Sequence, residues 1–206
     1  MCSSDLLLAE RHDATGFPTV VVRPAAVYGP DDNIPDGEIA LFLRLRERRP
    51  VLVPHEGLVT FNYGHVDDLA LALVAAATTP AAVGGTFNVT ADAVTALHYV
   101  RTIGEIVGVE PDVCLIPDAV LAELDGPPPF NHRFQKVLHS VLSTDRARDV
   151  LGVVPRYDFA TGHRQTYEWF LEQGVDRFTG SMADPVWGVS WDFDREARIA
   201  AAIRGA

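Results

Sequence analysis

The stretch from Val20 to Pro30, V-V-V-R-P-A-A-V-Y-G-P, decides the fold of this chain. Three β-branched residues are followed by an Arg-Pro pair, and a Tyr-Gly-Pro turn closes the stretch. An apolar run that stops at a proline and opens into such a turn is typical of the carboxyl end of a buried parallel strand. Ligands of open α/β sheets bind at that edge, so the loop after Val22 is the first candidate for a functional site.

The composition allows one large domain or two small lobes, because the chain has 206 residues of which 48% are apolar. No apolar run approaches the roughly 18 residues of a membrane span, and no secretory signal opens the sequence, so we expect no membrane partner. Two cysteines, Cys2 and Cys114, predict no disulfide framework and no metal site, which fits a reducing cytoplasm. The net charge of −11 argues against binding to nucleic acid.

Apolar segments separated by glycine and proline predict the remaining elements. We expect helices at 7–14, 36–49, 69–79, 95–107, 143–151, 159–172 and 194–203, and strands at 50–54, 84–89 and 113–117. Val20–Val22 and Phe87–Val89 are predicted to be central, mostly buried strands, with the Leu69–Ala77 helix packed beside them.

Three groups of polar residues have more than one interpretation. The four arginines of the 36–49 helix suit either an anionic substrate or, as we favour, a solvated helix end that complements the macrodipole. We interpret Asp67-Asp68 as an N-terminal cap of the following helix in preference to a metal site. His65 has no His or Cys partner at ligand spacing, so we expect it to be packed against the protein.

Four blocks of sequence resemble the NAD-dependent epimerase/dehydratase family, the extended short-chain dehydrogenases/reductases. They are Arg-Pro-x-x-Val-Tyr-Gly-Pro at 23–30, Val-Asp-Asp-Leu-Ala at 66–70, Gly-x-x-Asn-Val at 85–89 and Ser-Thr-x-x-Ala-x-x-x-Leu-Gly-x-x-Pro at 143–155. The resemblance implies an α/β fold, the C-terminal part of a Rossmann-type parallel sheet plus the smaller α/β substrate-binding lobe. It also implies hydride exchange with NAD or NADP in the intact parent.

We divide the chain into residues 1–6, residues 7–174 with the family-like fold and substrate lobe, and a tail at 175–206 with a terminal helix. Residues 1–6, Met-Cys-Ser-Ser-Asp-Leu, can be encoded by the end of a common sequencing adapter. We interpret them as a non-native scar, which would make the chain a fragment; the alternative is a genuine N-terminus.

The resemblance also nominates site residues. The loop that faces the nicotinamide in the family corresponds to Pro24, Ala25, Ala26 and Val27. The candidate substrate contacts are Asn33, Phe61 and Tyr63. Sugar-nucleotide members often have Asn in place of Ala26, and many have a diphosphate-binding Arg in place of Phe61. These two departures predict a substrate without a diphosphate at that subsite.

The chain lacks the family's catalytic pair and its phosphate-binding turn. Lys136 is the only lysine, with His132 four residues before it, and the family's tyrosine and lysine would fall at Cys2 and Leu6. Gly84-Gly85 precedes a strand and therefore does not form a dinucleotide-binding turn. We nominate no catalytic residue and no metal ligand, and we expect no tight cofactor binding by this chain.

The resulting prediction is the substrate-side fragment of an NAD(P)-dependent epimerase, dehydratase or reductase, inactive as given. Its intact parent would act in the cytoplasm on a small sugar-like or other hydroxylated molecule, and the resemblance allows a homodimer of that parent. The alternative is a non-catalytic binding or regulatory protein that retains the fold.

Overall fold

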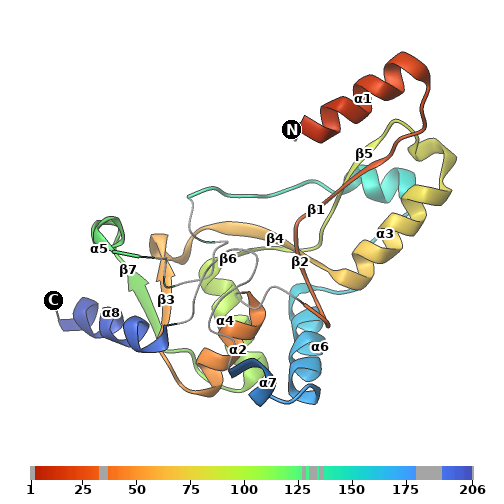
Figure 1. The fold of residues 1–206 in the computed structure, drawn as a ribbon. Coiled ribbons are helices and arrows are strands. Elements are labelled where there is room, and N and C mark those ends of the chain that lie inside the picture. Colours follow the sequence, from red (N-terminus) through yellow and green to blue (C-terminus); the bar gives the residue numbers. More distant parts are fainter. Residues whose placement is uncertain are drawn as a thin grey trace. The chain divides into compact units, whose positions relative to one another are not determined.

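The computed structural model describes residues 3–32, 37–126, 129, 134, 137–179 and 192–205 (Figure 1). Contacts divide the chain into two compact units. Unit 1 comprises Met1–Val27, Asn62–Asp92 and Val141–Phe159, and unit 2 comprises Tyr28–Phe61, Ala93–Ser140 and Ala160–Ala206. The chain passes from one unit to the other at five points, two of which lie within strands β2 (Ala26–Tyr28) and β4 (Thr60–His65). Helices separate the strands along the chain, and two pairs of strands are parallel. These features confirm the predicted α/β class.

Unit 1 is built on a pair of parallel strands. Its elements are α1 (Ser3–Thr15), β1 (Val21–Pro24), α3 (Val66–Thr78), η2 (Pro80–Ala82), β5 (Thr86–Val89) and the π-helical turn η4 (Ala147–Leu151). Val21 of β1 lies opposite Thr86 of β5, and the register continues to Pro24 opposite Val89. The core lies where α3 and η4 meet this pair, with Ala72, Ala76 and Phe87 buried in it.

The predicted helix beside these strands is therefore confirmed, and the predicted position of the strands is partly wrong. Phe87 and Val89 are buried as expected. Val21 and Val22 are only half-buried, and β1 and β5 form a sheet of two strands among the described residues, so neither is central. A strand with one neighbour has one row of backbone groups without a ladder partner, which explains the partial exposure of β1.

Unit 2 contains a second parallel pair surrounded by helices. Its elements are α2 (Glu38–Arg46), β3 (Val51–Pro54), η1 (His55–Gly57), β6 (Ala93–Thr95), α4 (Ala96–Val107), β7 (Val113–Ile116), α5 (Asp118–Glu123), α6 (Phe159–Glu172), α7 (Asp176–Thr179) and α8 (Phe193–Gly205). β3 pairs with β7 from Val51 opposite Val113 to Pro54 opposite Ile116. The described helices include none that is both long and apolar enough to span a membrane.

The N-terminal cap of α4 is a usual capping residue, whereas that of α3 is not the residue that the sequence predicts. The hydroxyl of Thr95, at the start of the helix predicted at 95–107, accepts the His98 N–H at 3.2 Å and caps α4. The prediction that an aspartate caps α3 is wrong. The cap is His65, whose Nδ1 accepts the Asp67 N–H at 3.2 Å. Both aspartates lie inside the first turn, where their charges still favour the helix N-terminus.

The solvated helix end that we favoured for the arginines of the predicted 36–49 helix is right for Arg46 and Arg48, which are exposed, and wrong for Arg44. Arg44 is 6% exposed and forms two hydrogen bonds of 2.8 Å with Glu196 of α8. Arg46 donates to the Tyr167 hydroxyl of α6 at 3.1 Å. These side chains therefore hold the C-terminal helices to α2 inside unit 2, and they bind carboxylate and hydroxyl groups of the protein itself.

Candidate functional site

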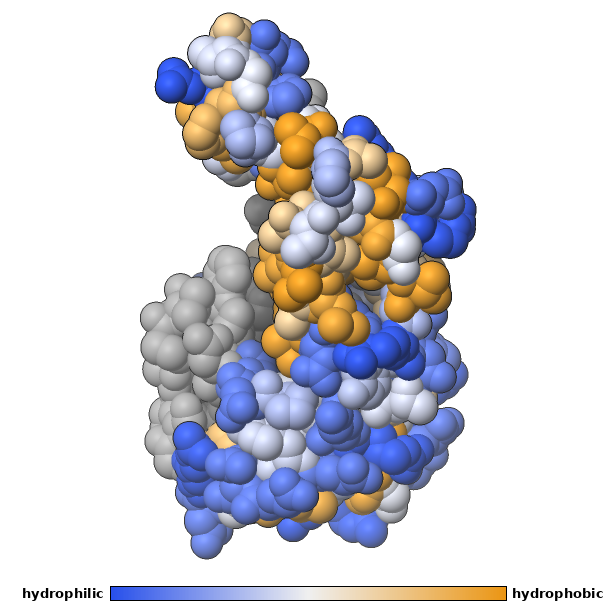
Figure 2. Space-filling model, turned by 90° about the vertical axis from the view of Figure 1, so that its right-hand side faces the viewer, coloured by the Kyte–Doolittle hydropathy of each residue, from blue (hydrophilic) through white to orange (hydrophobic). Residues whose placement is uncertain are grey.

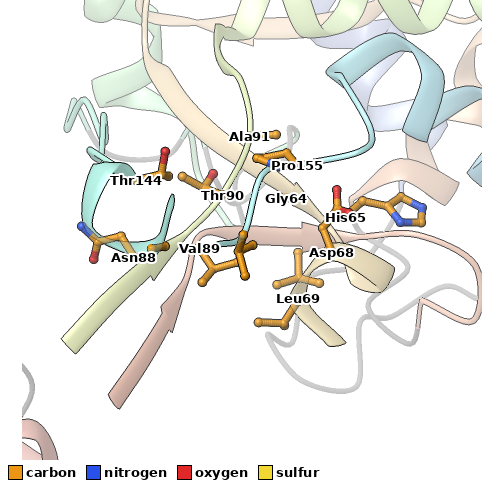
Figure 3. Close-up of a pocket in the computed structure, with 13 residues that line it drawn as sticks. Gly64, His65, Asp68, Leu69, Asn88, Val89, Thr90, Ala91, Thr144 and Pro155 are labelled. Atoms are coloured by element: carbon orange, nitrogen blue, oxygen red, sulfur yellow. The ribbon is translucent and has the colours of Figure 1, made fainter. Parts of the chain in front are cut away.

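The candidate site lies in unit 1, at the carboxyl ends of the β1/β5 pair. Figure 3 shows the small pocket formed there, where residues at the end of β5 meet the N-terminal turn of α3. Val89 and Leu69 give the pocket an apolar floor, and Thr90 and Thr144 carry hydroxyl groups beside it. Ligands of open α/β sheets bind at this edge, which is the reason for building the site here.

The pocket is small in its present form. Its cavity volume is about 10 Å³, close to the ~10–15 Å³ that one water molecule requires. Neither a nicotinamide nor a sugar ring fits into such a space. A ligand of unit 1 would therefore contact the outer surface of this edge.

His65, Asp68 and Tyr157 fix the wall of the pocket. His65 is fully buried, and its ring stacks on Tyr157 with 4.0 Å between centroids, which confirms the expected packed histidine. In Figure 3 its imidazole points away from Val89 and Thr90. Asp68, 4% exposed, accepts the backbone N–H groups of Arg156 and Tyr157 at 3.1 and 3.2 Å. These contacts join the start of α3 to the segment before α6.

The loop nominated for the nicotinamide is accessible at this edge. Pro24 is exposed and Ala25, Ala26 and Val27 are half-buried. The Ala25 N–H donates to the Val89 carbonyl at 3.4 Å, so the loop continues the pairing of β1 with β5. Val27 lines the pocket. The loop offers backbone groups and small apolar side chains, which suits packing against a flat ring and provides no proton donor or acceptor on a side chain.

The three nominated substrate contacts lie in different surroundings. Asn33 is outside the described residues. Phe61 is half-buried in unit 2, where it forms a parallel bridge with Ser140. Tyr63 is 1% exposed in unit 1, with its ring edge-on to Phe159 at 5.1 Å. A ligand can thus reach the ring of Phe61 more easily than that of Tyr63.

Tyr28, within the deciding stretch, belongs to a buried polar cluster in unit 2 that sequence reasoning missed. The Tyr28 ring stacks on His163 of α6 with 3.8 Å between centroids. His163 Nε2 lies 3.5 Å from Glu38 Oε1, and both residues are fully buried. Tyr99 donates its hydroxyl to the same Glu38 oxygen at 3.4 Å. A Cβ added at Gly162 would collide with the Tyr28 hydroxyl. No spacing signal links these positions, because they come from four separate elements.

Titration behaviour near the pocket is set by local hydrogen bonds. The Ser143 hydroxyl donates to Asp145 at 2.8 Å, and together with the neighbouring Arg148 it lowers the pKa of Asp145. In β7, burial raises the pKa of the Cys114 thiol. The described residues contain no group of three or more His, Cys, Asp or Glu that could hold a metal ion.

Comparison with known proteins shows what the first part of the chain is similar to. Residues 2–90 match the family model described as NAD dependent epimerase/dehydratase family. The first part of the chain is therefore similar to this family. The predicted resemblance is thereby confirmed, and the match contains β1, the nominated loop, α3 and β5.

Solved structures share the fold at low sequence identity. Epimerase Mth375 of Methanothermobacter thermautotrophicus aligns with a TM-score of 0.67 at 20% identity, over 84% of this chain and 49% of that protein. UDP-glucuronic acid 4-epimerase of Bacillus cereus, in complex with UDP-glucuronic acid and NAD, aligns with a TM-score of 0.67 at 19% identity, over 83% and 51%. The chain thus spans about half the length of these structures.

The chain covers a still smaller share of a curated relative. The chloroplast stem-loop binding protein of 41 kDa b from Arabidopsis thaliana is 27% identical over 161 residues, which are 76% of this chain and 40% of that protein.

Proposed function

We propose that this chain is the substrate-side part of an NAD- or NADP-dependent epimerase, dehydratase or reductase that acts on a sugar-like or other hydroxylated substrate. One observation carries the proposal: the loop from Pro24 to Val27 lies exposed or half-buried at the carboxyl end of a parallel strand pair, within the part that matches the family. The Bacillus cereus epimerase, which shares the fold, holds NAD and UDP-glucuronic acid in its structure.

We expect the chain to be inactive unless the part of the protein that binds the cofactor is also present. Tight binding of a dinucleotide in this fold requires a glycine-rich turn that presents backbone N–H groups to the pyrophosphate at a helix N-terminus. The 206 residues contain no such turn and no Tyr-x-x-x-Lys pair. A single loop contact with the nicotinamide would not offset the freedom that the dinucleotide loses on binding.

A non-catalytic binding protein that retains the fold is the second candidate. The Arabidopsis thaliana relative is named as a stem-loop binding protein. The net charge of −11 disfavours a phosphate backbone as the ligand of this chain. A small-molecule ligand therefore fits this second candidate better than a nucleic acid.

Calorimetry tests the first candidate. NAD and NADP are titrated into the 206-residue chain and into a form that carries the reading frame upstream of residue 7. We expect micromolar binding by the longer form alone. Micromolar binding of either dinucleotide by the short chain would contradict the proposal, and an upstream frame without a glycine-rich turn would favour the non-catalytic candidate.

Phe61 allows a test of the substrate class. We expect the longer form to bind UDP-glucose weakly, because Phe61 cannot make the bidentate contact of an arginine with a diphosphate. Phe61→Arg should strengthen that binding in a salt-sensitive manner. Leu58→Arg is the matched control, since Leu58 is an exposed apolar residue of the same unit. Tight UDP-glucose binding before any substitution would refute the predicted substrate class.

A further inference from the structure

The first turn of α3 is held by a histidine, which is not among the usual capping residues. His65 immediately precedes the helix, is fully buried, and accepts the Asp67 N–H on its Nδ1 atom at 3.2 Å. Beyond the first turn, α3 carries no charged side chain, and Figure 2 shows a largely hydrophobic surface over this helix. The charged contacts of α3 are therefore concentrated at its N-terminus.

The cap fixes the protonation state of His65. A ring nitrogen accepts a hydrogen bond only in the neutral imidazole, where the other nitrogen carries the proton. Nδ1 is therefore unprotonated in the capped helix, and the proton of the neutral ring lies on Nε2. Uptake of a second proton would place an N–H of His65 against the N–H of Asp67. It would also add a positive charge at the N-terminus of α3, where the macrodipole disfavours cations.

Asp67 provides an alternative partner for the charged ring. Its Oδ2 atom lies 3.8 Å from His65 Nδ1, which is within ion-pair range but too long for a hydrogen bond. The same oxygen accepts the Tyr157 hydroxyl at 3.2 Å, and the Tyr157 ring stacks on His65 with 4.0 Å between centroids. A small movement of the Asp67 side chain would let Oδ2 accept a proton from Nδ1. The charged state would thus exchange the helix cap and the Tyr157 contact for an ion pair.

Other titratable groups of unit 1 lie on the elements around His65. They are Tyr63 of β4, Asp68 of α3, Asp92 after β5, and Arg156 and Asp158 before α6. Asp68 pairs with Arg156 at 3.2 Å, and Asp92 accepts the Phe159 N–H at 2.7 Å. These two carboxylates are thus engaged by other donors. Asp67, at 3.8 Å, is therefore the acceptor in unit 1 for a charged ring.

We propose that His65 is a proton-sensitive switch at the candidate site. In its neutral form His65 caps α3 and leaves Asp67 to Tyr157, which keeps the start of α3 against the segment before α6. In its charged form the cap is lost, Asp67 turns to the imidazolium, and the first turn of α3 loosens. His65, Asp68 and Leu69 line the pocket, so the change reaches the carboxyl edge of the β1/β5 pair. The switch does not depend on which ligand binds at that edge.

NMR of the isotope-labelled 206-residue chain tests this switch. At neutral pH we expect His65 to carry its proton on Nε2 and to show a scalar coupling between Nδ1 and the Asp67 amide nitrogen across the hydrogen bond. Between about pH 8 and pH 5, the range in which histidine ordinarily changes charge, this coupling should disappear with the same midpoint as the charging of His65. The hydrogen-exchange protection of the Asp67 amide should fall about fivefold, as expected for loss of a helix cap.

Two substitutions separate the cap from the ion pair. His65→Asn keeps a side chain that is among the preferred N-terminal caps and does not titrate, so the Asp67 amide should stay protected across the pH range. Asp67→Asn removes the carboxylate that favours the charged imidazole and should move the midpoint of His65 to lower pH. The His98 amide is the internal control, because the Thr95 hydroxyl that caps it at 3.2 Å does not change charge in this range.

Three results on the unsubstituted chain would overturn the proposal. They are a proton on Nδ1 of His65 at neutral pH, a cap that persists after His65 becomes charged, and a His65 that stays neutral until the chain unfolds. Unchanged pH dependence of the Asp67 amide in His65→Asn would also overturn it. Circular dichroism checks that both variants remain folded, and the measurements on the unsubstituted chain decide the question if a variant does not fold.

Discussion

The ion pair between Arg44 and Glu196 makes a sharp prediction about the C-terminal helix. Their side chains are only 8% and 3% exposed, and two hydrogen bonds of 2.8 Å join them. Arg44→Met removes the cation and leaves the Glu196 carboxylate buried without its charged partner. Loss of one member of a buried pair costs about 3–5 kcal/mol. We therefore expect the free energy of unfolding to fall by about that amount.

Urea unfolding, followed by circular dichroism, measures this change. Arg204→Met is the matched control, since Arg204 of the same helix forms a bidentate pair with Asp112 in which the side chains are 47% and 50% exposed. Exposed pairs contribute about 1 kcal/mol or less. The double variant Arg44→Met with Glu196→Met should recover most of the loss, because it buries no charge. Equal effects of the two arginine substitutions would refute the reasoning.

Two further predictions concern unit 1. Asp68→Ala leaves two backbone N–H groups without their acceptor in a nearly buried position and should cost about 3 kcal/mol in urea unfolding, whereas Asp67→Ala, at a half-exposed side chain, should cost about 1 kcal/mol or less. The lowered pKa of Asp145 means that its ionised form stabilises the native state above its usual pKa of 3.8, and that this contribution disappears as the pH falls through the lower native value. NMR titration should therefore give a midpoint below 3.8, and both Ser143→Ala and Arg148→Ala should raise it, because the Ser143 hydrogen bond and the Arg148 hydrogen bond and charge all lower this pKa; a midpoint at 3.8 or above would count against these causes.

Local signals in the sequence located most elements of the fold. The helix predicted at 159–172 is α6 (Phe159–Glu172), and the strand predicted at 84–89 contains β5 (Thr86–Val89). Thr95 and Gly108 bound α4 as a polar cap and a left-handed terminus. These signals work because caps, turns and apolar periodicity act over a few residues, which is the range that a sequence pattern records.

Contacts between distant positions were beyond the reach of such patterns. The four arginines of the predicted 36–49 helix were interpreted as a solvated helix end, but Arg44 is buried against Glu196, which lies 152 residues away in the sequence. His65 was expected to be packed, but its role as the cap of α3 was not foreseen because histidine is not among the usual capping residues. The position of β1 at an edge depends on how many strands flank it, which its own apolar run does not encode.

The contact between Tyr28 and Gly162 has a consequence for the evolution of this chain. The phenol occupies the space where a side chain at position 162 would begin. Homologues that keep tyrosine at position 28 should therefore keep glycine at position 162. Replacement of the glycine becomes acceptable only where the aromatic hydroxyl is lost or the ring is smaller. We expect these two positions, 134 residues apart in the sequence, to change together in an alignment of close homologues.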